Sequence, residues 1–131
     1  MGRLRIVGIG DDGPVGLTDQ ARKILSEADL VIATGSVLKM LGQTSVQQQF
    51  LPADMNEAVS LLHSAIKNYT SPVLVSEGDP LFFGVSRYFS DRLGKDAYEI
   101  HPHVSSMQLA FARVKETWDD AYLTSLAGRA L

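Results

Sequence analysis

The chain has 131 residues, enough for one domain with its own hydrophobic core. Hydrophobic residues make up 45% and charged residues 21%, which excludes a disordered or fibrous chain. The net charge of −3 argues against a nucleic-acid partner, and the lack of cysteine excludes disulfides and thiolate metal sites. The apolar runs are too short to span a bilayer and the start leaves no room for a signal peptide, so we expect a cytoplasmic protein with no membrane partner.

Short apolar runs alternate with helical patterns along the first half of the chain. Thr18 is a good N-cap for the first helix because its hydroxyl can accept a backbone N–H bond. The predicted elements, in chain order, are a strand over 4–9, a helix over 18–27, a strand over 29–33, a short helix over 36–41, a polar loop over 43–49 and a brief strand over 49–51.

The second half continues the alternation. Asp54-x-x-Glu57 has the form of a capping box and opens a long amphipathic helix that ends before Pro72. The elements after it are a strand over 73–76, a helix over 84–93 stopped by Gly94, a strand over 98–100, a helix over 105–112 and a closing strand over 121–124. Strands separated by helices predict an α/β fold, with a mainly parallel sheet and helices on both faces.

Three segments of unusual composition follow predicted strands: 8–16, 77–84 and 102–107. In a parallel sheet, the carboxyl ends of the strands meet at one edge, and ligands bind in the crevice beyond that edge. The sequence therefore predicts a ligand site built from these three loops.

The first loop, Gly8-Ile9-Gly10-Asp11-Asp12-Gly13, matches the spacing of the dinucleotide fingerprint. However, the next helix is expected only at Thr18, and two carboxylates would face a pyrophosphate with no evident cation nearby. A structural turn is one alternative. Close approach of the backbone to a ligand without phosphate fits the residues better.

The second loop carries Leu81, Phe82 and Phe83 directly after a Gly-Asp-Pro turn. Large apolar side chains are unexpected in a solvent-facing turn. They could form a wall against a flat ring, or they could start the next helix and pack into the core.

The third loop contains His101, His103, Ser105 and Ser106. The two histidines could ligate zinc, but too few further ligands accompany them, so we expect no metal. The serines most simply cap the following helix, where they could also present hydroxyl and N–H groups to a ligand carboxylate.

The ordered set of these segments resembles the tetrapyrrole methylase family, and within it the members that methylate ring carbon C5 of precorrin-6Y or cobalt-precorrin-7. The segments that carry the resemblance cover nearly the whole chain: 6–10, 17–18, 26–31, 77–84, 104–110, 118–121 and 125–129.

The resemblance implies an N-terminal α/β domain of such a methylase, with residues 1–131 forming one domain that binds S-adenosylmethionine, largely through backbone groups. It also implies a tetrapyrrole substrate, a homodimer and a second α/β domain that follows in the family where this sequence stops. No residue stands out as a catalytic base, so the isolated chain is expected to bind the methyl donor without turnover. The cofactor-binding residues implied are Gly8, Gly10, Gly78, Asp79, Pro80, Leu81, Phe82, Phe83, Ser105 and Ser106.

This sequence departs from the family pattern at His103, where members commonly have glycine. If the backbone requires glycine there, His103 should be strained or should narrow the site. Two other functions remain open: a shortened, non-catalytic paralogue that acts through dimerisation or binding, and a nucleotide-binding α/β domain.

Overall fold

Parallel strands form a single sheet in the computed structural model, which describes residues 3–81 and 92–121. Within those residues the strand order is β3-β2-β4-β1-β5, and every pairing is parallel. The strands are β1 (Leu4–Ile9), β2 (Leu30–Ala33), β3 (Gln47–Phe50), β4 (Pro72–Glu77) and β5 (Tyr98–His101). Their carboxyl ends therefore lie at the same edge of the sheet.

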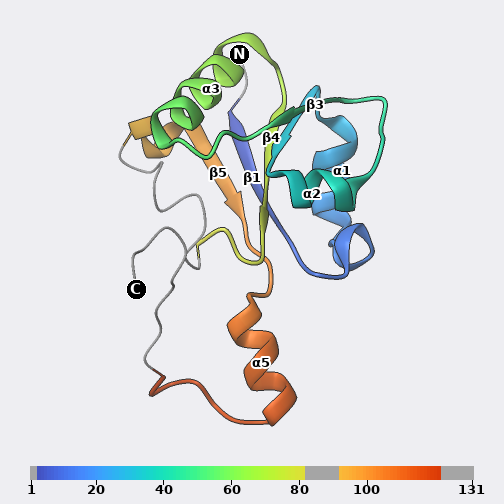
Figure 1. Ribbon diagram of the computed structural model, residues 1–131, viewed down its shortest axis with the longest axis vertical. Helices are drawn as coiled ribbons and strands as arrows, with labels where there is room; N and C mark the ends of the chain where they lie inside the picture. The colour runs from blue at the N-terminus through green and yellow to red at the C-terminus, as the bar shows by residue number, and fades with distance from the viewer. Residues whose placement is uncertain (1–2, 82–91, 122–131) are drawn as a thin grey trace.

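Helices cover both faces of this sheet (Figure 1). One face packs against α3, and the other packs against α1 and α2. The helices are α1 (Asp19–Glu27), α2 (Gly35–Leu41), α3 (Met55–Asn68) and α5 (Ser106–Val114), with short 3-10 turns η1 (Gly13–Gly16) and η2 (Lys95–Ala97). The predicted α/β class with helices on both faces is confirmed.

The apolar residues of each strand divide between the two faces. In β1, Leu4 and Ile6 join the cluster under α3, whereas Val7 and Ile9 join the cluster under α1 and α2. Successive side chains of a strand point to opposite faces, so a strand covered on both sides must be apolar at nearly every position. This explains why β1, β2 and β4 are apolar at most positions.

Side-chain caps mark the starts of α1 and α3. The Thr18 hydroxyl accepts the N–H of Ala21 at 3.1 Å, and the Asp54 carboxylate accepts the N–H of Glu57 at 3.0 Å. Both N-caps are where the sequence places them.

The polar segment before Leu51 differs from its prediction. Gln47 and Gln48 were expected in a loop, but they begin β3, which ends at Phe50 and not at Leu51. These glutamines pair with Leu30 and Val31 of β2. Strand propensity is weak in glutamine, and pairing with a buried neighbouring strand outweighs it here.

Two predicted elements fall largely outside the described residues: most of the helix over 84–93 and most of the strand over 121–124. Among the described helices, none is both long and apolar enough to cross a bilayer.

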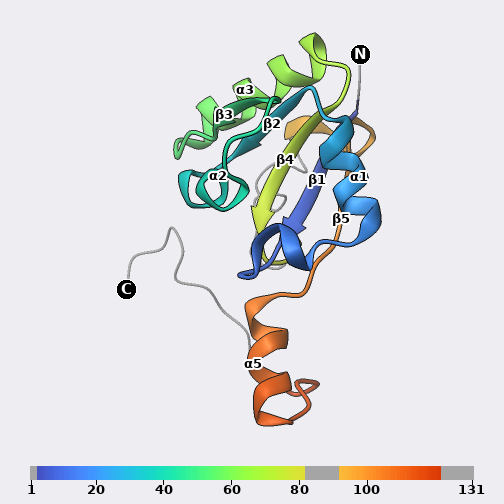
Figure 2. The same ribbon diagram turned by 90° about the vertical axis from the view of Figure 1, so that its right-hand side faces the viewer.

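Helix α5 extends away from the sheet, beyond the end toward which β1 and β4 run (Figure 2). It has no buried residue. The turn that leads into it places residues from its N-terminal end against the carboxyl edge of the sheet, where the candidate site lies.

Candidate functional site

A cavity of about 350 Å³ opens at the carboxyl edge of the sheet. Its walls come from the ends of β1 and β4, from α2, from the segment between β5 and α5, and from the first turns of α5. The lining residues are Ile9, Gly10, Asp11, Met40, Glu77, Gly78, Asp79, Val104, Ser105, Ser106 and Leu109. Each of the three loops predicted from the sequence contributes to this lining.

Gly78 shapes the turn after β4. Its φ is +66°, a conformation that side-chain-bearing residues rarely adopt, so glycine is required here. Its N–H donates to the carbonyl oxygen of Ile9 at 2.7 Å, which ties the turn to the end of β1. Gly10 and Gly78 both line the cavity.

Gly8 lies behind the cavity and does not line it. A Cβ atom at this position would lie 2.4 Å from the Gly78 carbonyl oxygen and 2.7 Å from the Cβ of His103. Non-bonded side-chain atoms do not approach other atoms that closely. Glycine at this position therefore allows the loops that follow β4 and β5 to pack directly over β1.

The turn residues after Gly78 have separate placements. Asp79 lines the cavity, and its Oδ1 accepts the N–H of Leu81 at 3.2 Å. Pro80 is buried, with its ring near Gly8, whereas Leu81 is 65% exposed and lines neither this cavity nor the second one described below. Leu81 therefore does not pack into the core, which was one of the two alternatives that the sequence left open for this residue. Phe82 and Phe83 lie outside the described residues.

Ser105 and Ser106 occupy the N-terminus of α5. Ser105 is 2% exposed, and its hydroxyl accepts the N–H of Gln108 at 3.2 Å while the Gln108 side chain accepts the N–H of Ser105 at 2.8 Å. This reciprocal capping box confirms the predicted helix start. Ser106 is exposed and faces the cavity beside it.

A second cavity, of about 570 Å³, lies beside the first and shares Gly10, Asp11, Asp79, Val104 and Leu109 with it. Its further lining residues are Asp12, Gly16, Thr18, Pro102, His103 and Gln108. Among the described residues that line either cavity, none is lysine or arginine. The two cavities together are therefore rich in carboxylates and lack a strong cation.

The first loop, which contains Gly8, Gly10 and Gly13 and is called the glycine loop below, does not have the geometry of a dinucleotide site. In that fingerprint the third glycine opens an α-helix whose N-terminus holds the pyrophosphate. Here Gly13 begins the 3-10 turn η1, and α1 starts only after Thr18. Asp11 and Asp12 supply negative charge where a pyrophosphate would need positive charge.

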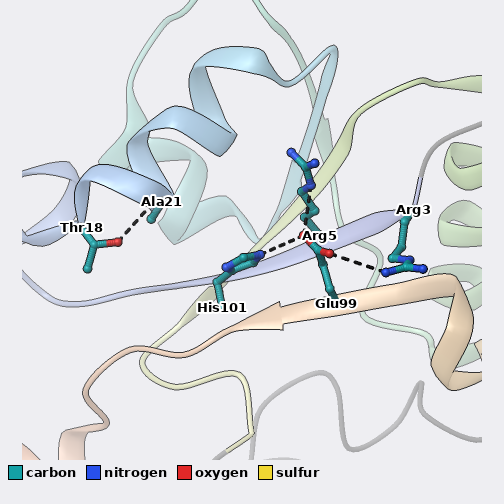
Figure 3. Close-up of polar contacts among 6 residues, drawn as sticks. All are labelled: Arg3, Arg5, Thr18, Ala21, Glu99 and His101. Carbon is teal, nitrogen blue, oxygen red and sulfur yellow. Dashed lines mark hydrogen bonds and ion pairs between the residues drawn. The ribbon is translucent and has the colours of Figure 1, made fainter.

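A charged cluster on β1 and β5 lies apart from both linings (Figure 3). Glu99 Oε1 is 3.0 Å from His101 Nε2 and 3.2 Å from Arg5 Nε, and Arg3 lies 3.8 Å from the other oxygen. The hydrogen bond from His101, together with the charges of Arg5 and Arg3, lowers the pKa of Glu99 despite its partial burial. His101 and His103 thus contact different partners. Among the described residues, no three potential ligand side chains gather as a metal site would require.

Met40 and Leu109 line the cavity but were not predicted from the sequence to do so. Both belong to helical patterns in which an apolar residue usually signals core packing, so nothing distinguished them. Met40 reaches the site because α2 follows β2 directly at the same sheet edge. The Ser36 hydroxyl at the start of α2 donates to Glu77, which links α2 to the end of β4.

Comparisons with known proteins agree with this geometry. A sequence model described as Tetrapyrrole (Corrin/Porphyrin) Methylases matches residues 3–130. The chain is 32% identical to the precorrin-6Y C(5,15)-methyltransferase (decarboxylating) of a Sinorhizobium species, over 98% of this chain but 31% of that protein.

Solved structures show the same fold. The precorrin-6Y methylase of Archaeoglobus fulgidus superposes with a TM-score of 0.74 at 23% identity, over 89% of this chain and 60% of that one. The uroporphyrin-III C-methyltransferase of Thermus thermophilus, solved with S-adenosylhomocysteine, gives a TM-score of 0.70 at 25% identity, over 83% and 51%. The chain spans between about a third and three fifths of the length of these proteins. From the match over nearly its whole length, the chain belongs to the tetrapyrrole methylase family.

Proposed function

We propose that this chain is the cofactor-binding domain of an S-adenosylmethionine-dependent C-methyltransferase of cobalamin biosynthesis that acts at C5 of a precorrin ring. The observation that carries the proposal is the cavity at the carboxyl edge of the sheet, lined by all three predicted loops. Family membership supports it, as does the name of the Sinorhizobium relative. The Thermus structure, which contains S-adenosylhomocysteine, supports the identity of the methyl donor.

The residues present fit a sulfonium ligand. A volume of about 350 Å³ falls in the range of small-molecule sites. Ile9, Met40 and Leu109 supply apolar surface, and the glycines leave backbone groups accessible. The carboxylates suit a ligand with a cationic centre, whereas a phosphate-bearing ligand would meet repulsion.

The N-terminus of α5 is suited to the carboxylate end of such a ligand. The capping box uses the N–H groups of Ser105 and Gln108. The first turn of an α-helix leaves N–H groups without intrahelical acceptors, and α5 begins at Ser106. Unpaired N–H groups and the helix dipole together favour an anionic group at this position.

S-adenosylmethionine, when bound, supplies an electrophilic methyl group on a positively charged sulfur. The part of this chain is to hold the donor and fix its orientation, since methyl transfer depends on alignment of the reacting atoms. Apolar side chains at the cavity wall exclude water from one side of the ligand. We assign no proton transfer to a residue of this chain.

The tetrapyrrole substrate and the homodimer implied by the resemblance, and the cytoplasmic location expected from the sequence, are part of the same proposal. The relatives are longer than the segment that matches this chain. This supports the proposal that the matched segment binds the methyl donor and that other parts of such proteins perform other steps. Size-exclusion chromatography with light scattering tests the dimer.

Calorimetric titration with S-adenosylhomocysteine tests cofactor binding. We expect weak, saturable binding, and a ligand concentration of ten times Kd should stabilise the fold by about 1.4 kcal/mol. Leu109 lines both cavities, so Leu109→Gln should weaken binding roughly three- to tenfold through lost apolar contact.

Val114→Gln is the matched control, because Val114 ends the same helix, is 63% exposed and lines neither cavity. Absence of heat at millimolar ligand, together with an unchanged melting temperature, would refute the proposal. Equal weakening by both variants would place the ligand elsewhere.

A further inference from the structure

His103 contacts the glycine loop from the other side of the site. It follows β5, and its Nε2 lies 3.3 Å from the carbonyl oxygen of Gly16. A Cβ at Gly10 would be 2.9 Å from the imidazole Cε1. The histidine side chain therefore occupies space that Gly8 and Gly10 leave open.

The backbone of His103 is not strained. Among the described residues, Lys115 is the sole non-glycine residue with a positive φ. The sequence left two alternatives for His103, backbone strain or a narrowed site, and the first is excluded because the loop does not use the left-handed conformation for which glycine is required. The other expectation, that His103 narrows the site, agrees with its place in the lining of the larger cavity.

The contact with Gly16 differs in kind from the other hydrogen bonds at η1. Gly13 N–H donates to Gly10 O at 3.1 Å, and Leu17 N–H donates to Pro14 O at 3.2 Å, both within the loop. The Arg22 guanidinium donates to Val15 O from seven residues away. His103 reaches the same turn from 87 residues away, and so joins the glycine loop to the segment before α5.

We propose that His103 is a positioning residue that holds the 10–16 loop at the wall of the cofactor site. This inference rests on the proposed function. With the proton of the neutral ring on Nε2, the ring donates to Gly16 O at 3.3 Å; Nδ1 then carries no hydrogen, so it does not bond Val104 O, which lies 3.4 Å away. Asp11, Asp12 and Asp79 line the cavity that the ring borders. Without this link, the loop would have to be ordered when the ligand binds, which costs affinity.

Titration of S-adenosylhomocysteine into three variants of the full chain tests the inference. His103→Ala should weaken binding about three- to tenfold, the range expected for loss of one hydrogen bond. His103→Gln should restore binding to within about twofold, because glutamine carries an N–H donor at a similar distance from its backbone. His101→Gln is the matched control, since His101 contacts Glu99 and lines neither cavity.

Amide hydrogen exchange at Leu17, measured without ligand, provides a second readout. Its bond to Pro14 O should open more often in His103→Ala and not in His101→Gln. If His103→Ala binds as tightly as the wild type, or more tightly, and exchange at Leu17 is unchanged, the inference is overturned. Failure of the wild type itself to bind would instead overturn the proposed function.

Discussion

Replacing Gly8 by alanine is the sharpest test of how the site is assembled. Gly8 is the next-to-last residue of β1, and an added Cβ would lie 2.4 Å from Gly78 O, 2.7 Å from His103 Cβ and 2.9 Å from Pro80 Cδ. All three distances are shorter than Cβ contacts found in proteins. The added methyl group would therefore have to push two loops away from the sheet.

Relaxation at this position is restricted. The carbonyl oxygen of Gly78 cannot move freely, because the N–H of the same residue donates to Ile9 O at 2.7 Å. Pro80 is buried, so its ring has little space into which to shift. Overpacking of this kind costs about 1–3 kcal/mol, and three simultaneous contacts place Gly8→Ala near the upper limit. For a chain of this size, about 3 kcal/mol corresponds to a fall in melting temperature of roughly 10 °C.

Urea and thermal unfolding followed by circular dichroism measure this loss. Gly35→Ala is the control, since its Cβ would meet only the ring of Phe50, at 3.1 Å, and that ring is 61% exposed and free to move. Gly35 also begins α2, where alanine is the better helix former, so the control should be neutral or slightly stabilising. If Gly8→Ala unfolds within about 0.5 kcal/mol of the wild type, the close approach of the loops does not have the importance given to it here.

Two further predictions concern stability. Ser105→Ala removes the cap of α5 and should reduce the free energy of unfolding, measured by urea denaturation, by about 1 kcal/mol. Ser106→Ala is the control and should have little effect, because Ser106 is exposed. Equal effects of the two variants would refute the capping role. Glu99→Gln tests the cluster on β5: because the pKa of Glu99 is lowered in the folded chain, its stabilisation is present above the ordinary carboxyl pKa of about 4.5 and is lost as the pH falls through the lowered value. The wild type should exceed this variant by less than about 1 kcal/mol at neutral pH, since the group is partly exposed, and a difference that grows on acidification would contradict the assignment.

Much of the architecture follows from the sequence alone. Segments such as 4–9 and 73–76 are apolar at most positions, which favours strands buried on both faces of a sheet that helices cover, so a parallel α/β fold is the consistent solution. Thr18, Asp54 and Ser105 mark helix starts through local hydrogen bonds, which depend on neighbours three residues away. Because the carboxyl ends of parallel strands share one edge, the sequence alone also predicts that the three loops meet at one site.

The tertiary structure decided how the described residues of those loops are placed. Gly8, expected at the ligand, lies so close to Gly78 and Pro80 that a side chain there would keep the loops apart. Met40 lines the cavity, although the pattern of its helix did not predict this, and Leu81 is exposed to solvent. His103 could not be interpreted from sequence, since its role depends on a carbonyl group 87 residues away. Local sequence determines local hydrogen bonding and burial, whereas contacts between distant loops depend on the packing of the whole sheet edge.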